Sequence, residues 1–280
     1  MARAPSLDRA RRQFAEELRV TAHVGDERVV EAFATVPRER FAGPGPWHFL
    51  HLADGYWTTA DGDPRWLYHN VLVALDTSRG INIGEPQLWA YHLDRIGVSK
   101  QDRVLQIGAG SGYYTAILAE LAAGVDAIEI DEPLADAARR NLADRPTVRI
   151  HRADASHPIA GEWDVIVAFA GAAAPHRWWL DALADGGRLL LPMTADGRRG
   201  GFMLRLDRQG DVFAARSLGW VAFYPCIGAR QTDDEAALRE ALGDAAGQAA
   251  VRSLRRDRHE RDTSCWLHRD GWCLSRRALN

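Results

Sequence analysis

Short apolar runs of β-strand length alternate with helical patterns through the middle of this chain. Five such runs follow one another between residues 104 and 193. Apolar runs that alternate with helices in this way are typical of a parallel sheet with right-handed crossovers, so the pattern predicts an α/β fold. The expected strands are VLQI (104–107), AIEI (127–130), VRIH (148–151), DVIVAF (164–169) and RLLLPM (188–193).

The N-terminal part of the chain follows other patterns. Apolar positions recur at helical spacing from residue 7 to 36, which predicts two short helices, and Pro37 ends the second. Residues 43–66 are rich in Gly, Pro and Trp and keep no sustained period. We therefore expect an irregular but ordered loop there.

The C-terminal part is expected to complete the sheet first and then to form a helix and a terminal hairpin. FMLRL and VFAARSL, which follow Gly201, predict an antiparallel hairpin that completes the sheet. Residues 233–255 indicate an Ala-rich helix, and Asp270-Gly271 between apolar flanks predicts a tight terminal hairpin.

Composition and charge narrow the classes of function. The 280 residues include 35 basic and 38 acidic side chains, and no basic stripe is present, so nucleic acid is not an expected partner. No apolar segment reaches about 18 residues, and the N-terminus lacks the apolar stretch of a signal peptide. With three cysteines, an odd count that suits a reducing compartment, we expect a cytoplasmic protein without a membrane partner.

The strongest candidate site is the segment VLQIGAGSGYYTAIL (104–118), where a buried strand leads into Gly108, Gly110 and Gly112 before a helix. A dinucleotide fingerprint, G-x-G-x-x-G, would place its third glycine at the position of Tyr113. The loop therefore suits a cofactor whose nucleoside and amino-acid tail pass close to the backbone. Glycine fits here because a Cβ atom would block that approach.

Two acidic residues follow the next two expected strands. Glu129 ends the second strand and can accept hydrogen bonds from both hydroxyls of a ribose. Asp154 follows the third strand, with Ala155 beside it, and can accept from an adenine amine. Either acid alone could be a helix cap or a solvated charge. Together, at successive strand ends on the edge where such sheets bind ligands, they predict an adenosine site.

These segments resemble the class I S-adenosylmethionine-dependent methyltransferases, and within them the protein-L-isoaspartate O-methyltransferase family. The resemblance runs from about Val29 to Gln231. It includes the glycine loop, VPRERF (36–41), AIEID (127–131), RADAS (152–156), WDVIVAFAGAAAP (163–175), LADGGRLLLPM (183–193) and VAFYPCIG (221–228).

The resemblance implies a Rossmann-like sheet, mostly parallel with an antiparallel terminal hairpin. It also implies S-adenosylmethionine as cofactor, with S-adenosylhomocysteine as product, held by the three glycines, both acids and Ala155. The domains expected on this basis are N-terminal helices with an aromatic substrate or lid region at 1–79, the cofactor-binding methyltransferase domain at 80–232, and a helix and hairpin extension at 233–280.

The sequence after the fourth strand argues against some acceptors. Methyltransferases that act on adenine or glutamine amino groups typically carry an Asn/Asp-Pro-Pro-Tyr motif there, whereas this chain has Ala170 to Pro175 without it. Metal-assisted catechol methyltransferases place acids at that strand end, and none is present, so no catalytic metal is expected. Methyl transfer mainly requires that the nucleophile be oriented and water excluded.

The chain also departs from the family it resembles. The family's motif before the glycine loop, roughly G-x-T-I-S-x-P, is here Gly80 to Pro86 with Asn82 and Gly84 in place of the two hydroxyl residues. In that family the hydroxyl-bearing loop lies over the cofactor and helps to hold the substrate carboxylate. The change therefore implies a rebuilt acceptor site.

An aromatic set lies upstream of this motif, and Trp89 continues it beyond the motif. The upstream members are Trp47, Phe49, Tyr56, Trp57, Trp66 and Tyr68. One interpretation is a wall that stacks on a planar acceptor, with Tyr56, Trp57, Tyr68, Asn82 and Trp89 as substrate-binding candidates. The alternative is that large side chains simply bury a long loop or form a subunit interface.

Three residues are candidates for proton handling. His69 and His176 could act as bases for a phenol or an indole N–H, and Glu85 could face the acceptor. For Glu85, an acid at a helix N-terminus ahead of Pro86 is an equally good interpretation.

The C-terminal tail contains two histidines and two cysteines that could together bind a zinc ion. The intervening segments of five, two and four residues match no standard finger, and the Asp-Gly turn already explains the segment. We therefore predict a capping hairpin and no metal, and a homo-oligomer formed through the N- or C-terminal extension is compatible with it. The four residues are His259, Cys265, His268 and Cys273.

The sequence favours C- or O-methylation of an aromatic small molecule in specialised metabolism. The third carbon of a tryptophan-derived indole is one acceptor that some relatives of this kind use. The first alternative is O-methylation of a carboxylate on isoaspartyl or aspartyl residues of a peptide or protein. The second alternative is a protein that binds S-adenosylmethionine in a regulatory or scaffolding role and has lost turnover.

Overall fold

The computed structural model describes residues 6–195 and 200–279. The chain forms two compact units that interleave in sequence. Unit 1 comprises residues 1–101, 109–125 and 131–151, and unit 2 comprises residues 102–108, 126–130 and 152–280. The three-segment division expected from the sequence, with boundaries at 79/80 and 232/233, stays a prediction.

Unit 1 contains the N-terminal helices, and both predicted helices are confirmed. Each begins at a side-chain cap: Ser6 accepts from the Arg9 N–H, and Asp26 accepts from the Arg28 N–H. The helices of this unit are α1 (Leu7–Thr21), α2 (Glu27–Thr35), α3 (Glu39–Ala42), the 3-10 helix η1 (Pro64–Leu67), α4 (Pro86–Ile96), α5 (Tyr113–Leu121) and α6 (Glu132–Asn141).

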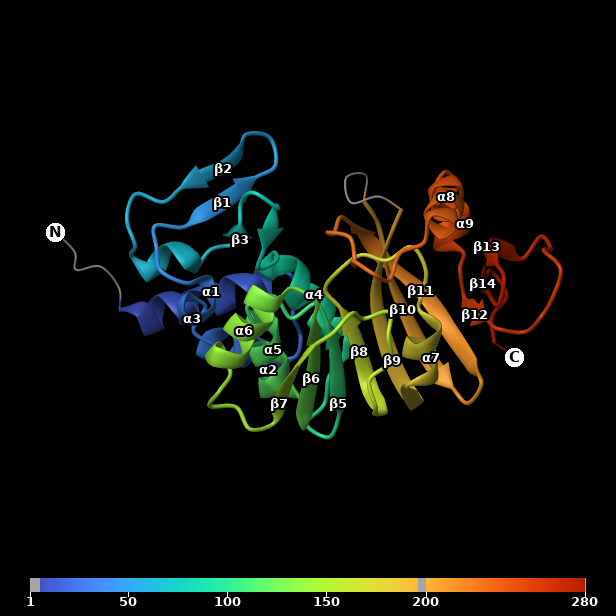
Figure 1. Ribbon diagram of the computed structural model, residues 1–280, viewed down its shortest axis with the longest axis horizontal. Coiled ribbons are helices and arrows are strands. Elements are labelled where there is room, and N and C mark those ends of the chain that lie inside the picture. Colours follow the sequence, from blue (N-terminus) through green and yellow to red (C-terminus); the bar gives the residue numbers. More distant parts are fainter. Residues whose placement is uncertain (1–5, 196–199, 280) are drawn as a thin grey trace. The chain divides into compact units, whose positions relative to one another are not determined.

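A four-stranded sheet of unit 1 occupies part of the segment that we expected to be an irregular loop. Its order is β2-β1-β3-β4, formed by β1 (His48–His51), β2 (Gly55–Thr58), β3 (Leu72–Asp76) and β4 (Ile81–Asn82) (Figure 1). The expectation was wrong because the Asp54-Gly55 turn, with Gly55 at φ +82°, closes an antiparallel hairpin between His51 and Gly55.

The large sheet confirms the α/β expectation. Its order is β13-β14-β12-β11-β10-β9-β8-β5-β6-β7. β8 pairs in parallel with both β5 and β9, whereas β10 and β11 form the predicted antiparallel hairpin. The strands are β5 (Arg103–Ile107), β6 (Gly124–Glu129), β7 (Val148–Arg152), β8 (Trp163–Ala168), β9 (Leu183–Thr194), β10 (Gly201–Gln209), β11 (Val212–Val221), β12 (Ser253–Arg255), β13 (Cys265–Arg269) and β14 (Trp272–Ser275).

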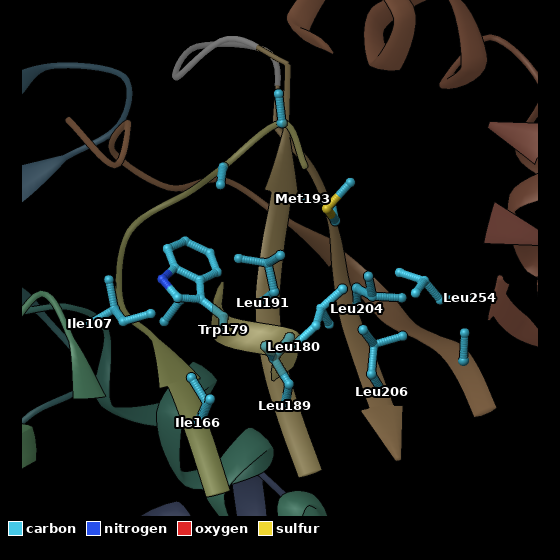
Figure 2. Close-up of a cluster of buried hydrophobic side chains, with 14 of the residues drawn as sticks. Ile107, Ile166, Trp179, Leu180, Leu189, Leu191, Met193, Leu204, Leu206 and Leu254 are labelled. Atoms are coloured by element: carbon cyan, nitrogen blue, oxygen red, sulfur yellow. The ribbon is translucent and has the colours of Figure 1, made fainter. Parts of the chain in front are cut away.

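The core of unit 2 lies on one face of this sheet. Side chains of β9 and β10, such as Leu191 and Leu204, lie in one cluster with Trp179 of α7 (Arg177–Asp181), and all three are fully buried (Figure 2). Full burial of one such side chain contributes roughly 1.5–3 kcal/mol. Leu254 and Trp266 belong to the same cluster, so the C-terminal extension is part of this core.

The C-terminal extension differs from its prediction in one respect. Instead of one helix over 233–255, the chain forms α8 (Thr232–Ala241), α9 (Ala245–Ala249) and then β12. The break occurs because Asp244 caps α9, where its carboxylate accepts from the Gly247 N–H at 2.8 Å. The Asp270-Gly271 hairpin is confirmed, with Gly271 at φ +79°. In the described part of the chain, no helix is both long and apolar enough to cross a bilayer.

Candidate functional site

The expected adenosine residues of unit 2 lie at one edge of its sheet. The Gly108 N–H donates to the Ile128 carbonyl at 2.9 Å, and the Ala153 N–H donates to the Glu129 carbonyl at 3.1 Å. These backbone bonds hold the carboxyl ends of β5 and β6 and the residues after β7 side by side. Glu129 is 8% exposed at this edge, and Asp154 follows Ala153 directly. Open α/β sheets bind ligands at this edge.

The three glycines of the loop serve different purposes. Gly108 has φ +85° and Gly110 has φ +55°, and an added Cβ atom at either would make only ordinary contacts. Glycine is favoured there by the left-handed backbone. Gly110 and Gly112 belong to unit 1, and a Cβ atom at Gly112 would lie 2.8 Å from Leu142 Cδ1 at the end of α6. Gly112 therefore allows α5 and α6 to pack closely.

The carboxylate of Asp154 lies against a segment that the sequence did not assign to the site. Asp154 Oδ1 accepts from the Ser156 N–H at 2.8 Å. At Gly228, with φ +87°, an added Cβ atom would lie 2.2 Å from both carboxylate oxygens. Burial raises the pKa of the neighbouring Cys226 thiol to about 12, and the Asp154 carboxylate acts in the same direction, so this thiol stays protonated. The segment VAFYPCIG (221–228), which contains Gly228, was recognised in the sequence as part of the family resemblance. The sequence alone did not show that Gly228 lies against Asp154.

Arg230 is a second residue that the sequence analysis missed. It ties together the segment after β8 and the end of β9. Its guanidinium donates to the Gly171 carbonyl at 2.9 Å, to the Thr194 carbonyl at 2.9 Å and to the Ala195 carbonyl at 2.6 Å. Its Nε also contacts Glu235 at 2.6 Å. Arg230 thereby fixes the chain that follows Gly228.

His176 and Ala155 lie on the Asp154 side of unit 2. The Ala155 carbonyl accepts from the indole N–H groups of Trp178 at 2.8 Å and Trp179 at 3.0 Å. The His176 ring packs 5.7 Å from the Trp179 ring, centroid to centroid. Burial lowers the pKa of His176, and the nearby Asp154 carboxylate opposes that shift. The fold thus brings His176 toward the cofactor candidates, while its role as a base stays a prediction.

In unit 1, two of the acceptor candidates contact each other. The Tyr56 hydroxyl donates to Asn82 Oδ1 at 2.9 Å, and Asn82 Nδ2 donates to the Gly80 carbonyl at 2.9 Å. Glu85 stands at the N-cap of α4, where Oε1 accepts from Asn70 Nδ2 at 2.9 Å. Glu85 is therefore part of the helix start, and a role toward substrate stays a prediction.

Other aromatic candidates pack inside unit 1. Tyr68 is 3% exposed, and its hydroxyl contacts Glu39 and accepts from Arg11 Nε at 2.9 Å. Burial raises the pKa of Tyr68. Trp89 is 1% exposed, and its ring centroid lies 5.7 Å from that of Tyr114. For these two residues the structure shows packing in the core, which was the alternative interpretation of the aromatic set.

Trp57 and His69 are the exposed candidates. Trp57 is 45% exposed and packs edge-on against Phe49 at 5.1 Å between centroids. The side chain of His69 is exposed, whereas its carbonyl accepts from Arg38 Nη1 at 3.1 Å. Arg38, which is fully buried, also donates to the carbonyls of Leu67 and Val71 at 2.8 Å each. It holds this segment in place, a role that the VPRERF motif alone did not reveal.

Comparison with known proteins gives a consistent result. The model of the family described as protein-L-isoaspartate(D-aspartate) O-methyltransferase matches residues 64–231. The protein-L-isoaspartate O-methyltransferase of Methylorubrum populi is 33% identical over 79% of this chain and 96% of its own length. That of Rhodopseudomonas palustris is 34% identical over 74% of this chain and 88% of its own.

Two solved structures share the fold. One, named protein-L-isoaspartate O-methyltransferase, has a TM-score of 0.65 at 20% identity and covers 89% of this chain and 72% of its own. A Plasmodium falciparum structure of the same description, in complex with S-adenosyl-L-homocysteine, has a TM-score of 0.61 at 18% identity. It covers 77% of this chain and 97% of its own.

Proposed function

Because the chain belongs to the protein-L-isoaspartate O-methyltransferase family, we propose that it methylates the free carboxylate of isoaspartyl residues in peptides or proteins. It is an S-adenosylmethionine-dependent methyltransferase. The observation that carries the proposal is the extent of the match, which covers 79% of this chain and 96% of a relative that bears this name.

The expectation of an aromatic small-molecule acceptor is wrong. It rested on the two missing hydroxyls between Gly80 and Pro86 and on the aromatic set before them. The family match over 64–231 and the relatives at 33% and 34% identity overturn it, together with the assignment to specialised metabolism and the indole acceptor. Burial of Tyr68 and Trp89 accounts for part of that aromatic composition without any ligand.

The residues of the sheet edge fit the cofactor. S-adenosylmethionine supplies a methyl group on a sulfonium. We assign the close approach of the cofactor to the backbone at Gly108 and Gly110, because a glycine carries no Cβ atom and also tolerates the left-handed conformation found at both positions. The carboxylates of Glu129 and Asp154 supply acceptors for ribose hydroxyls and an adenine amine. Gly112 contributes by setting the start of α5.

A carboxylate acceptor changes which catalytic tasks the protein has to perform. A carboxylate is already a nucleophile, so the reaction needs orientation and exclusion of water rather than removal of a proton. In unit 1 the Tyr56 hydroxyl donates to Asn82 Oδ1 and so orients the Asn82 amide, and we assign the Asn82 Nδ2 group, with Tyr56 as its positioning residue, to the substrate carboxylate in place of the family's hydroxyls. Glu85, His69 and His176 are then not required as bases.

The decisive experiment is a transfer assay with labelled cofactor. The full-length protein is incubated with methyl-labelled S-adenosylmethionine and an isoaspartyl peptide, and a peptide of the same sequence with normal aspartate is the control. We expect label only in the isoaspartyl peptide, released by mild base as expected for a methyl ester. No label in that peptide, while calorimetry shows that the cofactor binds, would contradict the proposal.

Two further expectations accompany this function. A cytoplasmic location agrees with the free state of Cys226, Cys265 and Cys273, since cytosolic proteins rarely contain disulfides. A homo-oligomer through the N- or C-terminal extension stays a prediction.

A further inference from the structure

Two histidines and two cysteines of the C-terminal extension meet on one side of the β13–β14 hairpin. Each offers one ligand atom, and the four atoms lie within 4.8 Å of one another. Both cysteines are buried and both histidines are half-buried. We propose that this cluster binds a structural zinc ion. Its members are His259, Cys265, His268 and Cys273.

A β-bulge explains why the sequence spacing argued against this site. In a regular strand, Cys265 and His268 would point to opposite faces because they are three residues apart. The hairpin register shifts between Cys265 and Leu267, which inserts one extra residue and brings both side chains to the same face. His268 pairs directly with Cys273 across the hairpin. His259 joins them from the segment that leads into β13.

The distances suit tetrahedral coordination. His259 Nε2 lies 3.5 Å from Cys265 Sγ, and the two imidazole centroids are 4.7 Å apart. Bond lengths of about 2.3 Å to sulfur and 2.0–2.1 Å to nitrogen place tetrahedral ligand atoms roughly 3.5 Å from one another. Small side-chain rotations therefore close the remaining gaps. Two thiolates and two imidazoles in this geometry favour zinc among divalent ions, and four protein ligands leave no position open for catalysis.

The surroundings of the cluster also suit a metal site. His259 Nδ1 lies 2.9 Å from the Asp257 carbonyl oxygen, which leaves Nε2 directed toward Cys265. Ligating histidines usually donate their second nitrogen in this way. The Asp262 N–H donates to Cys265 Sγ at 3.4 Å. Among the described residues, His268 Nδ1 is buried without a hydrogen-bond partner, which costs free energy unless a ligand satisfies it.

The ion would stabilise a part of the chain that polar contacts hold, such as the Arg256–Asp181 ion pair at 2.6 Å, rather than an apolar core. Residues 256–264, RDRHERDTS, contain no large apolar side chain and link β12 to β13. The cluster would join this segment to both strands of the hairpin. It lies beyond residue 231, where the family match ends, so the site is an addition to the family's core. A structural metal contributes directly to the stability of such a small element.

Metal analysis of the full-length protein tests the proposal. Protein produced in zinc-supplemented medium and purified with a reductant and without chelators should contain about one zinc ion per chain by mass spectrometry of the metal. Cys273→Ser and His268→Ala should each lower the zinc content more than twofold. Cys226→Ser is the matched control, because Cys226 is a buried cysteine outside the cluster, and it should retain the metal.

A second measurement covers variants that fail to fold. Wild-type protein stripped of metal and reconstituted with Co²⁺ should show the visible absorption of a tetrahedral, thiolate-bound ion, and zinc should displace it. The proposal is overturned if reduced wild-type protein takes up neither ion, or if Cys226→Ser loses as much zinc as Cys273→Ser. A disulfide between Cys265 and Cys273 in freshly purified protein, detected as two missing thiols, would also overturn it.

Discussion

Gly228 shows how one absent side chain controls the position of a charged group. An added Cβ atom would lie 2.2 Å from both oxygens of Asp154, and the backbone there has φ +87°. Gly228→Ala should therefore displace the Asp154 carboxylate. We expect weaker binding of S-adenosylmethionine, by on the order of 1–3 kcal/mol for a lost hydrogen bond to a charged acceptor, measured by isothermal titration calorimetry.

Gly210→Ala is the control for backbone strain. Gly210 also has a positive φ, +61°, but nothing lies within 4 Å of its added Cβ atom. This variant should lose some stability and keep its affinity for the cofactor. Equal affinities in the two variants would show that Asp154 does not contact the cofactor.

A second residue-scale prediction concerns pH and stability. His92 is 3% exposed, and burial, followed by the charge of Arg95, lowers the pKa of its imidazole from 6.5 to about 4. The unfolded chain therefore binds a proton before the folded chain does. The contribution to stability is complete above pH 6.5 and is lost as pH falls toward 4. Between pH 7 and 5 we expect His92 to account for a decrease of about 2 kcal/mol in the free energy of unfolding.

Urea denaturation at both pH values tests this expectation. His92→Leu should reduce the loss of stability between pH 7 and 5. His157→Gln is the control, because His157 is exposed. An identical pH dependence in wild type and His92→Leu would exclude His92 as the cause. Carboxylates with lowered pKa values also stabilise the fold less as the pH falls. They lose this contribution to the free energy of unfolding mainly below about pH 5.

At the scale of elements, Arg230 connects three parts of unit 2. It is 9% exposed as a side chain and donates to carbonyls after β8 and at the end of β9, while it pairs with Glu235 of α8. Arg230→Met would remove one donor from each of these carbonyls, although the Gly171 carbonyl would still accept from the Cys226 N–H at 2.8 Å. We expect a loss on the order of 3 kcal/mol in the free energy of unfolding, measured by urea denaturation. Arg177→Met, at a side chain that is 86% exposed, should change it by less than about 0.5 kcal/mol.

Elements were predictable where local signals agree with the fold. The strands β5 and β8 follow mostly apolar runs, interrupted in β5 by Gln106, and burial on both faces of the sheet explains them. The β1–β2 hairpin was missed because its Gly-, Pro- and Trp-rich surroundings mask a period of two. The same Asp-Gly signal that located the terminal hairpin was present at Asp54-Gly55. The break between α8 and α9 depends on a cap at Asp244 that no periodicity records.

At the scale of the whole molecule, the candidate site likewise contains residues that the sequence could locate and residues that only the fold brings together. The glycine loop and Glu129 could be located because each directly follows a buried strand, so local sequence carries their position. The contact of Asp154 with Gly228 joins residues that are far apart in sequence, and only the fold brings them together. The four residues of the C-terminal histidine and cysteine cluster could be named from the sequence, but their spacing argued against a zinc site because it does not record the bulge that brings Cys265 and His268 to one face. The aromatic residues led to a wrong prediction of the acceptor, because large aromatic side chains fill a hydrophobic core as readily as they line a ligand site.

The last prediction concerns what the family-matched segment needs in order to fold. Strand β12 pairs with β11, and Leu238, Leu254 and Trp266 lie in the core cluster of unit 2. A chain that ends at residue 231 would expose that cluster and the unpaired edge of β11, which favours aggregation. We expect this truncated protein to be insoluble or to lack a cooperative thermal transition by circular dichroism. A chain that ends at Arg277 should behave like the full-length protein, and a cooperatively folded truncated protein would show that the C-terminal extension is not part of the core.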